Sequence, residues 1–203
     1  AQWQAAPRAD LRLSSTFYQE GKVLPTRVNA ISVQALYNEK EILFRLSWHD
    51  RVENRQSPVD AVALALLPDL RTKWRTGSLR GWPANSEVPN FDLTYWSAER
   101  NSVQQGVVPS VEPLEAGKGA ADPRLTGEAA YQDGEWTLLV RRPLAGVVDQ
   151  AVRLDPSQGE VPFGVMVWEG GNGERGRHRA NSRWVDLAFI AKKLAEQSHG
   201  EDL

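Results

Sequence analysis

A glycine-rich turn followed by a run of basic residues offers most of the chemistry in this sequence. Gly170-Gly171-Asn172-Gly173 is followed by Arg175, Arg177, His178 and Arg179. Arginine binds carboxylates and phosphates through paired hydrogen bonds, and a neutral imidazole is a metal ligand. The loop is therefore either a solvated hairpin tip or a site for an anionic or propionate-bearing ligand, with His178 available to a metal.

The segments on either side of this loop are predicted to position it as a hairpin. In residues 161–168, Phe163, Val165 and Val167 fall on one face, and Met166 falls on the other. Glycines tolerate positive φ and allow the chain to turn after this strand. Residues 184–187 then alternate again, so we expect them to pair back with the first strand.

Other segments show the same period of two, which is typical of half-buried strands. Glycine, proline and Asp-Gly turns join them, and no long stretch carries a helical pattern. The sequence therefore predicts an all-β antiparallel β-sandwich with little helix. The predicted strands lie in residues 1–30, 31–37, 42–48, 60–68, 91–96, 125–131, 135–144, 161–168 and 184–187, and a short helix is expected after residue 188.

Length and composition bound the function classes. The 203 residues are enough for one domain spanning 1–203, with a polar surface excursion at about 97–123. A net charge of -2 gives no bulk attraction to nucleic acid. The chain has no cysteine, which excludes disulfides, thiolate metal sites and covalently attached c-type haem. No apolar run approaches the roughly 20 residues of a membrane span.

A long loop at residues 69–90 interleaves basic and aromatic side chains, among them Lys73, Trp74, Arg80 and Trp82. Loops of this length are usually functional or disordered, and tryptophans need somewhere to bury. Single-stranded nucleic acid would suit such a loop, but the overall charge opposes it. One wall of a haem pocket fits better, because aromatic side chains would pack on the macrocycle and cations would pair with its propionates.

Several motifs resemble one known family. Trp168-Glu169, the turn 171–176 (GNGERG) and Ser182-Arg183-Trp184 resemble the C-terminal signature of the haem b-binding gamma subunits of type II dimethyl sulfoxide reductase-family enzymes. These enzymes include ethylbenzene dehydrogenase, dimethyl sulfide dehydrogenase, chlorate reductase, selenate reductase and, more distantly, nitrite oxidoreductase. The segments 33–50 (VQALYNEKEILFRLSWHD), 60–68 and 135–143 are also similar, and the resemblance covers roughly residues 28–187.

The resemblance implies a β-sandwich that holds one haem b and transfers electrons without being catalytic. It implies a periplasmic molybdenum oxidoreductase complex, with a molybdopterin catalytic subunit, an iron–sulfur subunit and a soluble cytochrome c as redox partner. Residues 97–123 would then be an interface or lid, where composition alone also allows a mobile loop. A chain that starts at Ala1 is expected to be a mature form after signal cleavage, although a trimmed chain would look the same.

The residues at the positions of the axial haem ligands differ from those of that family. It uses a methionine from the long loop and a lysine or histidine from the C-terminal hairpin, where this chain has Arg80 and Arg179. Arginine stays protonated and is a poor iron ligand. We therefore expect His178 to ligate the iron after a one-residue shift. The second ligand is open among Lys73, His49 and Met166, or absent.

Other parts of the predicted haem site follow from the same assignment. Arg177 and Arg179 would pair with the propionates, and Lys73, Trp74 and Arg80 would line the pocket. His49, beside Asp50, also has the simpler role of a hydrogen-bonded residue at a strand end, and Met166 that of core filler.

Three alternatives remain at this point. Haem is bound by quite different residues, or the chain is a haem-less structural or assembly subunit of such a complex. The third is an extracytoplasmic carbohydrate-binding β-sandwich, in which Trp74 and Trp82 stack on sugar rings. An enzyme is the least favoured class, because no Ser-His-Asp order, carboxylate pair or cysteine nucleophile stands out.

Overall fold

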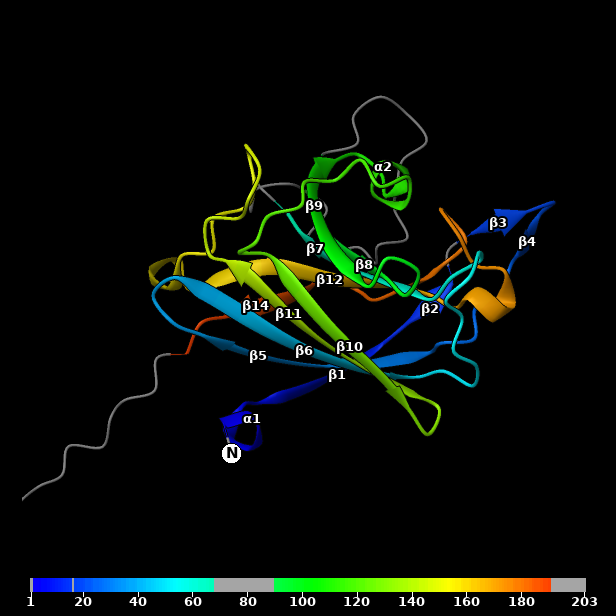
Figure 1. Ribbon diagram of the computed structural model, residues 1–203, viewed down its shortest axis with the longest axis horizontal. Coiled ribbons are helices and arrows are strands. Elements are labelled where there is room, and N and C mark those ends of the chain that lie inside the picture. Colours follow the sequence, from blue (N-terminus) through cyan, green and yellow to red (C-terminus); the bar gives the residue numbers. More distant parts are fainter. Residues whose placement is uncertain (1, 16, 68–89, 191–203) are drawn as a thin grey trace, which may run out of the picture.

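The chain folds as two antiparallel sheets packed face to face, as Figure 1 shows. The computed structural model describes residues 2–15, 17–67 and 90–190. The predicted all-β antiparallel β-sandwich is confirmed. The predicted helix after residue 188 and the loop that carries Lys73, Trp74, Arg80 and Trp82 fall largely or wholly outside the described residues.

The first sheet has five strands, and its central strand is the return arm of the predicted 31–48 hairpin. That hairpin and the one around Asp133-Gly134 are both confirmed, and Asp133 and Gly134 have φ of 52° and 78°, as an Asp-Gly turn requires. In spatial order the strands are β1 (Arg8–Arg12), β5 (Ala30–Tyr37), β6 (Glu41–His49), β11 (Glu135–Pro143) and β10 (Thr126–Gln132).

The second sheet has seven strands. The predicted apolar strand lies inside it, between β12 and β8, and is buried on both faces. In spatial order the strands are β2 (Ser14–Ser15), β13 (Ala180–Asn181), β12 (Glu160–Trp168), β7 (Ala61–Leu66), β8 (Phe91–Ser97) and β9 (Ser102–Val108), with β14 (Val185–Ala188) also paired to β12.

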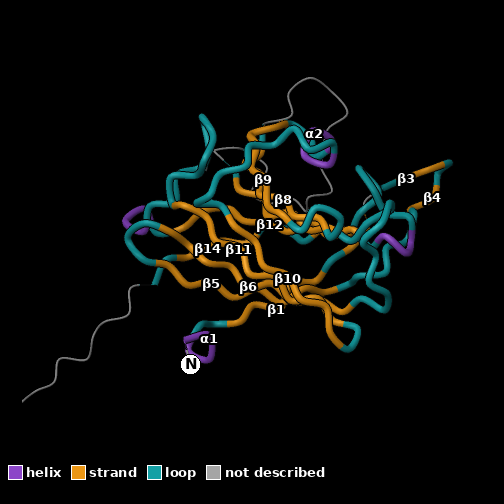
Figure 2. The backbone as a smooth tube through the Cα atoms, viewed as in Figure 1, coloured by secondary structure: helices purple, strands orange, loops and turns teal. Residues whose placement is uncertain are grey.

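Helices are short pieces at the margins in the described part of the chain, as Figure 2 shows. None of those described is long and apolar enough to cross a membrane. They are α1 (Gln2–Ala5), α2 (Glu112–Glu115) and the 3-10 turns Pro156–Gln158 and Gly170–Asn172, and a small hairpin of β3 (Tyr18–Gln19) and β4 (Lys22–Val23) stands apart from both sheets.

Alternate side chains of the strands point inward and fill the space between the two sheets. Phe44 and Trp48 point inward from β6, and Phe163 points inward from β12 and stacks on Phe44 with ring centroids 5.6 Å apart. At one end, Trp48 and Trp136 stack at 6.1 Å, and Trp96 packs on both. Large rings therefore close this end of the core, where burial of each ring stabilises the fold by several times the thermal energy.

The outer face of the second sheet is also covered. Met166 and Trp168 point to this side, where Tyr95 of β8 and Leu114 of α2 join them in a second apolar cluster. Residues 97–123 are thus not only a polar surface excursion. They form β9 and α2, which add an edge strand and a cover to the sheet, as seen above β8 in Figure 1.

A buried ion pair fixes the loop that follows β11. Arg142 is fully buried and donates to Asp92 at 2.6 Å and to the Val152 carbonyl at 2.8 Å. Gln105 donates to the other oxygen of Asp92 at 2.6 Å and receives the Val147 N–H at 2.7 Å. The network joins β8, β9 and β11 to residues 147–152. Arg141, the neighbour of Arg142 on β11, points to the other face of the strand and is exposed.

We predict that Arg142→Ala lowers the free energy of unfolding by about 3–5 kcal/mol, because it leaves the Asp92 carboxylate buried without its cation. Arg141→Ala is the matched control, since Arg141 is exposed and its half-buried partner Glu41 lies 3.6 Å away, and we expect a change below about 1 kcal/mol. Chemical denaturation measures both. Equal losses in the two variants would contradict the assigned role of the buried pair.

Candidate functional site

The predicted C-terminal hairpin forms, but its glycines act differently from the expectation. β12 pairs with β13 and β14 across the loop. Gly173 and Gly176 have positive φ, whereas Gly170 and Gly171 do not. A Cβ on Gly170 would lie 2.3 Å from the Pro58 carbonyl oxygen. Gly170 is therefore required for close approach of two loops, and the expectation that its role is a positive φ is wrong.

His178 lies on the loop in contact with the N-terminal part of the chain. Its Nε2 is 3.0 Å from the Pro25 carbonyl, and its ring stacks on Phe17 with centroids 6.0 Å apart. A carbonyl only accepts hydrogen bonds, so Nε2 carries a proton, and in the neutral form of the ring Nδ1 keeps a lone pair.

Arg179 is held inside the protein. It donates to the Gly176 carbonyl at 2.8 Å and to Asn181 at 2.9 Å, and it lies over the Trp168 ring. Burial lowers the pKa of its guanidinium to about 10, while Glu112 and Glu115 act in the opposite direction. Arg179 thus ties the hairpin internally instead of facing solvent, whereas Arg177 is exposed.

The other predicted ligands lie in separate surroundings. Met166 is fully buried in the second apolar cluster. His49 is exposed at the end of β6 and lies close to Gly134. A Cβ added to Gly134 would be 3.2 Å from the Cε1 atom of His49. Lys73, Trp74 and Arg80 lie outside the described residues. Within the described ranges, no three His, Asp or Glu side chains form a group that could hold a metal.

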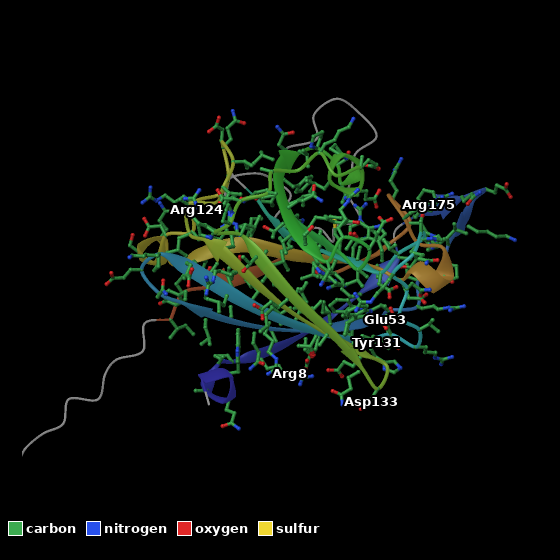
Figure 3. The ribbon with its side chains drawn as sticks, in the orientation of Figure 1. Arg8, Glu53, Arg124, Tyr131, Asp133 and Arg175 are labelled. Carbon is green, nitrogen blue, oxygen red and sulfur yellow. The ribbon has the colours of Figure 1, made fainter. Side chains whose placement is uncertain are left out.

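A cavity of about 520 Å³ opens at the end of the sandwich closed by the tryptophans. Residues from β1, β5, β6, β11 and the end of β12 surround it. In Figure 3, Arg8 lies on this part of the molecule, well apart from Arg175 of the basic loop. The lining residues are Arg8, Arg27, Val28, Asn29, Ala30, Ile31, Ser32, Ser47, Trp48, His49, Asp50, Arg51, Glu135 and Glu169.

With the carboxyl groups ionised, three buried polar atoms on lining residues have no hydrogen-bond partner: Trp48 Nε1, Asp50 Oδ2 and Glu169 Oε2. Asp50 and Glu169 are each 2% exposed. A buried polar group without a partner costs roughly 1–3 kcal/mol, more when it is charged. One donor and two acceptors without partners therefore lie just behind the surface of the cavity, on residues that line it.

Asp60 organises the wall behind these atoms. Its Oδ2 accepts from the Asn54 N–H at 2.7 Å and Trp136 Nε1 at 3.1 Å, and its Oδ1 accepts from the Gly170 N–H at 2.9 Å. Its backbone also bonds to Asn54 and to Ala98. One fully buried residue thus joins the 50–60 loop, β11 and the end of β12 through its carboxyl group, and the end of β8 through its backbone carbonyl.

The carboxyl groups around Asp60 are crowded in a poorly solvated place. Burial, followed by the charge of Asp60, raises the pKa of Asp50 to about 7. Burial also raises the pKa of Asp60, Glu169 and Glu174. When Asp50 is protonated it shares a hydrogen bond with Asp60. The cluster is therefore strained when all of its members are ionised.

Sequence reasoning missed this cavity. His49 was singled out from it, but Asp50 and Glu169 were weighed only as a neighbour and as part of a motif. Both stand directly after apolar strands, at Trp48-His49-Asp50 and Trp168-Glu169. An acidic residue at the end of an inward-facing strand is a weak signal, and its neighbours come from distant parts of the chain.

Comparison with known proteins gives a likeness in fold only. No family model and no curated protein matches the chain. A family 9 carbohydrate-binding module from Caldicellulosiruptor kristjanssonii in complex with glucose is similar with a TM-score of 0.53 at 11% identity, over 94% of this chain and 87% of that one. A family 9 module from the same organism with cellotriose gives 0.49 at 13% identity, over 89% and 73%.

We predict that Asp50→Asn flattens the pH dependence of stability. The raised pKa means that folding favours protonated Asp50, so its contribution is present below about pH 4 and is lost as the pH rises through about 7. Between pH 5 and 8 the wild type should lose about 2–4 kcal/mol more than the variant.

Asp149→Asn, at an exposed loop position, is the control for this measurement and should keep the wild-type pH dependence. Urea denaturation at several pH values measures the slopes. A wild-type slope retained in Asp50→Asn would show that Asp50 is not the strained group.

Proposed function

We propose that this chain is a non-catalytic carbohydrate-binding module and that the cavity beside Trp48 holds the sugar. The observation that carries the proposal is the pairing of a ligand-sized cavity with uncommitted buried polar atoms. Its volume of about 520 Å³ lies within the usual range for small-molecule sites. Trp48 Nε1, Asp50 Oδ2 and Glu169 Oε2 provide the polar contacts.

Sugar hydroxyl groups suit such a wall, because each hydroxyl both donates and accepts. A hydroxyl that donates to Asp50 or Glu169 makes a charge-assisted bond of above-average strength. Ser32 and Ser47, which are paired across β5 and β6, also line the cavity. The fold likeness to a module solved with glucose supports this class of ligand.

Isothermal titration calorimetry with glucose and short cello-oligosaccharides tests the proposal. We expect saturable binding to the wild type and at least tenfold weaker binding to Ala30→Trp, because Ala30 lines the cavity and a bulky ring would fill it. Ala130→Trp, on the exposed edge strand β10 away from the cavity, should bind as the wild type does. Binding that survives Ala30→Trp would place the sugar elsewhere.

A second candidate function is the haem b electron-transfer subunit to which the sequence motifs point. The position of His178 favours it: with Nε2 donating to Pro25, the Nδ1 lone pair is available to a metal. Under this proposal the protein would be periplasmic, and its partners would be a molybdopterin subunit, an iron–sulfur subunit and a soluble cytochrome c. A haem-less structural subunit of such a complex is the variant of this proposal without the cofactor.

The visible absorption spectrum separates the two candidates. If haem b is bound, the purified protein shows a Soret band, and His178→Ala weakens or abolishes it while His199→Ala leaves it unchanged. A spectrum without a Soret band after reconstitution with haem would remove the electron-transfer candidate. A band unaltered in His178→Ala would remove this ligand assignment.

A further inference from the structure

Four buried carboxyl groups lie at or behind the inner wall of the cavity, with little positive charge near them. Asp50, Asp60, Glu169 and Glu174 are 2%, 0%, 2% and 1% exposed. Within the described residues, the ion pair recorded for these four groups joins Glu169 to Arg27. That contact is 3.8 Å long, and the Arg27 side chain is 59% exposed. Because the contact is long and exposed to solvent, Arg27 compensates the charge of Glu169 only weakly.

Elsewhere in the same protein, buried charge is paired closely. Arg142 lies 2.6 Å from Asp92 with both side chains fully buried. Buried ions are normally paired or coordinated, because an isolated charge away from water is costly. The acidic wall departs from this pattern, and the uncompensated oxygens Asp50 Oδ2 and Glu169 Oε2 belong to residues that line the cavity.

The arginines at the rim do not cancel this charge. Arg8 is engaged with Asp10 at 3.0 Å and with Ser32 at 2.6 Å. Arg51 is exposed, and Arg27 is the cation that lowers the pKa of Glu169. The charges that act on Asp50 are those of Asp60 and Glu169, both negative.

We propose that the cavity prefers a saccharide that carries a protonated amine, with the ammonium group held by Asp50 and Glu169. This rests on the proposed carbohydrate binding and names the sugar class. An ammonium group has three hydrogen-bond donors and a positive charge. It would therefore provide both the donors and the compensating charge that the free oxygens of Asp50 and Glu169 lack. A neutral sugar hydroxyl satisfies one acceptor and leaves the charge uncompensated. Trp48 Nε1 would then donate to a ring hydroxyl.

Calorimetry with three matched β-1,4-linked oligosaccharides tests the preference. Glucosamine, N-acetylglucosamine and glucose oligomers of equal length differ only in the substituent at one ring carbon. At a pH where the amine is protonated, we expect the glucosamine oligomer to bind at least tenfold more tightly than the other two. The N-acetylated oligomer keeps the nitrogen atom but carries no positive charge, so it shows whether the charge or the nitrogen is recognised.

Charge-removing variants test which residues confer the preference. Glu169→Gln and Asp50→Asn keep the side-chain shape and should each reduce the preference for the amine at least fivefold. Glu53→Gln, an exposed carboxylate that does not line the cavity, should leave it unchanged. Circular dichroism of each variant verifies that the sandwich is intact.

The outcomes separate this inference from the proposed function. Equal or weaker binding of the glucosamine oligomer, with glucose oligomers bound at the cavity, overturns the preference and leaves carbohydrate binding in place. No binding of any oligomer overturns both. An amine preference that persists in both Glu169→Gln and Asp50→Asn also overturns the inference, because it would arise outside this wall.

Discussion

The end of the sandwich that carries the cavity depends on the hydrogen bonds of one buried aspartate. Asp60 directly precedes β7, a strand buried on both faces, and its side chain accepts three hydrogen bonds, from Asn54, Trp136 and Gly170. No water competes for these bonds, so each one positions a separate chain segment. Gly170 reaches its position because it lacks a side chain where the Pro58 carbonyl passes.

This arrangement has an electrostatic consequence. A carboxylate that collects several N–H donors stays buried, and the segments it gathers bring Asp50, Glu169 and Glu174 close to it. Burial raises the pKa of each group, and for Asp50 and Glu169 the charges of neighbouring carboxylates raise it further. Under the proposed function, the same crowding would give the cavity affinity for hydrogen-bond donors and for positive charge. Stability and recognition therefore oppose each other at this wall.

The sequence predicted the sandwich because local patterns determine most of it. Alternation along 42–48 and the Asp133-Gly134 turn act over a few residues, so both could be read directly. The cavity could not be predicted, because its lining comes from five strands and depends on their register. Arg179 is the instructive case: a basic loop residue expected to face a ligand instead packs over Trp168, since the 97–123 segment covers that face.

A crystal structure of the protein soaked with a glucosamine oligosaccharide tests the central claim most directly. We predict a sugar ring in the cavity, with its nitrogen within hydrogen-bond distance of Asp50 or Glu169 and a hydroxyl beside Trp48 Nε1. An empty cavity with the sugar bound elsewhere, for example against the stacked rings of Phe91 and Trp184, would contradict the account.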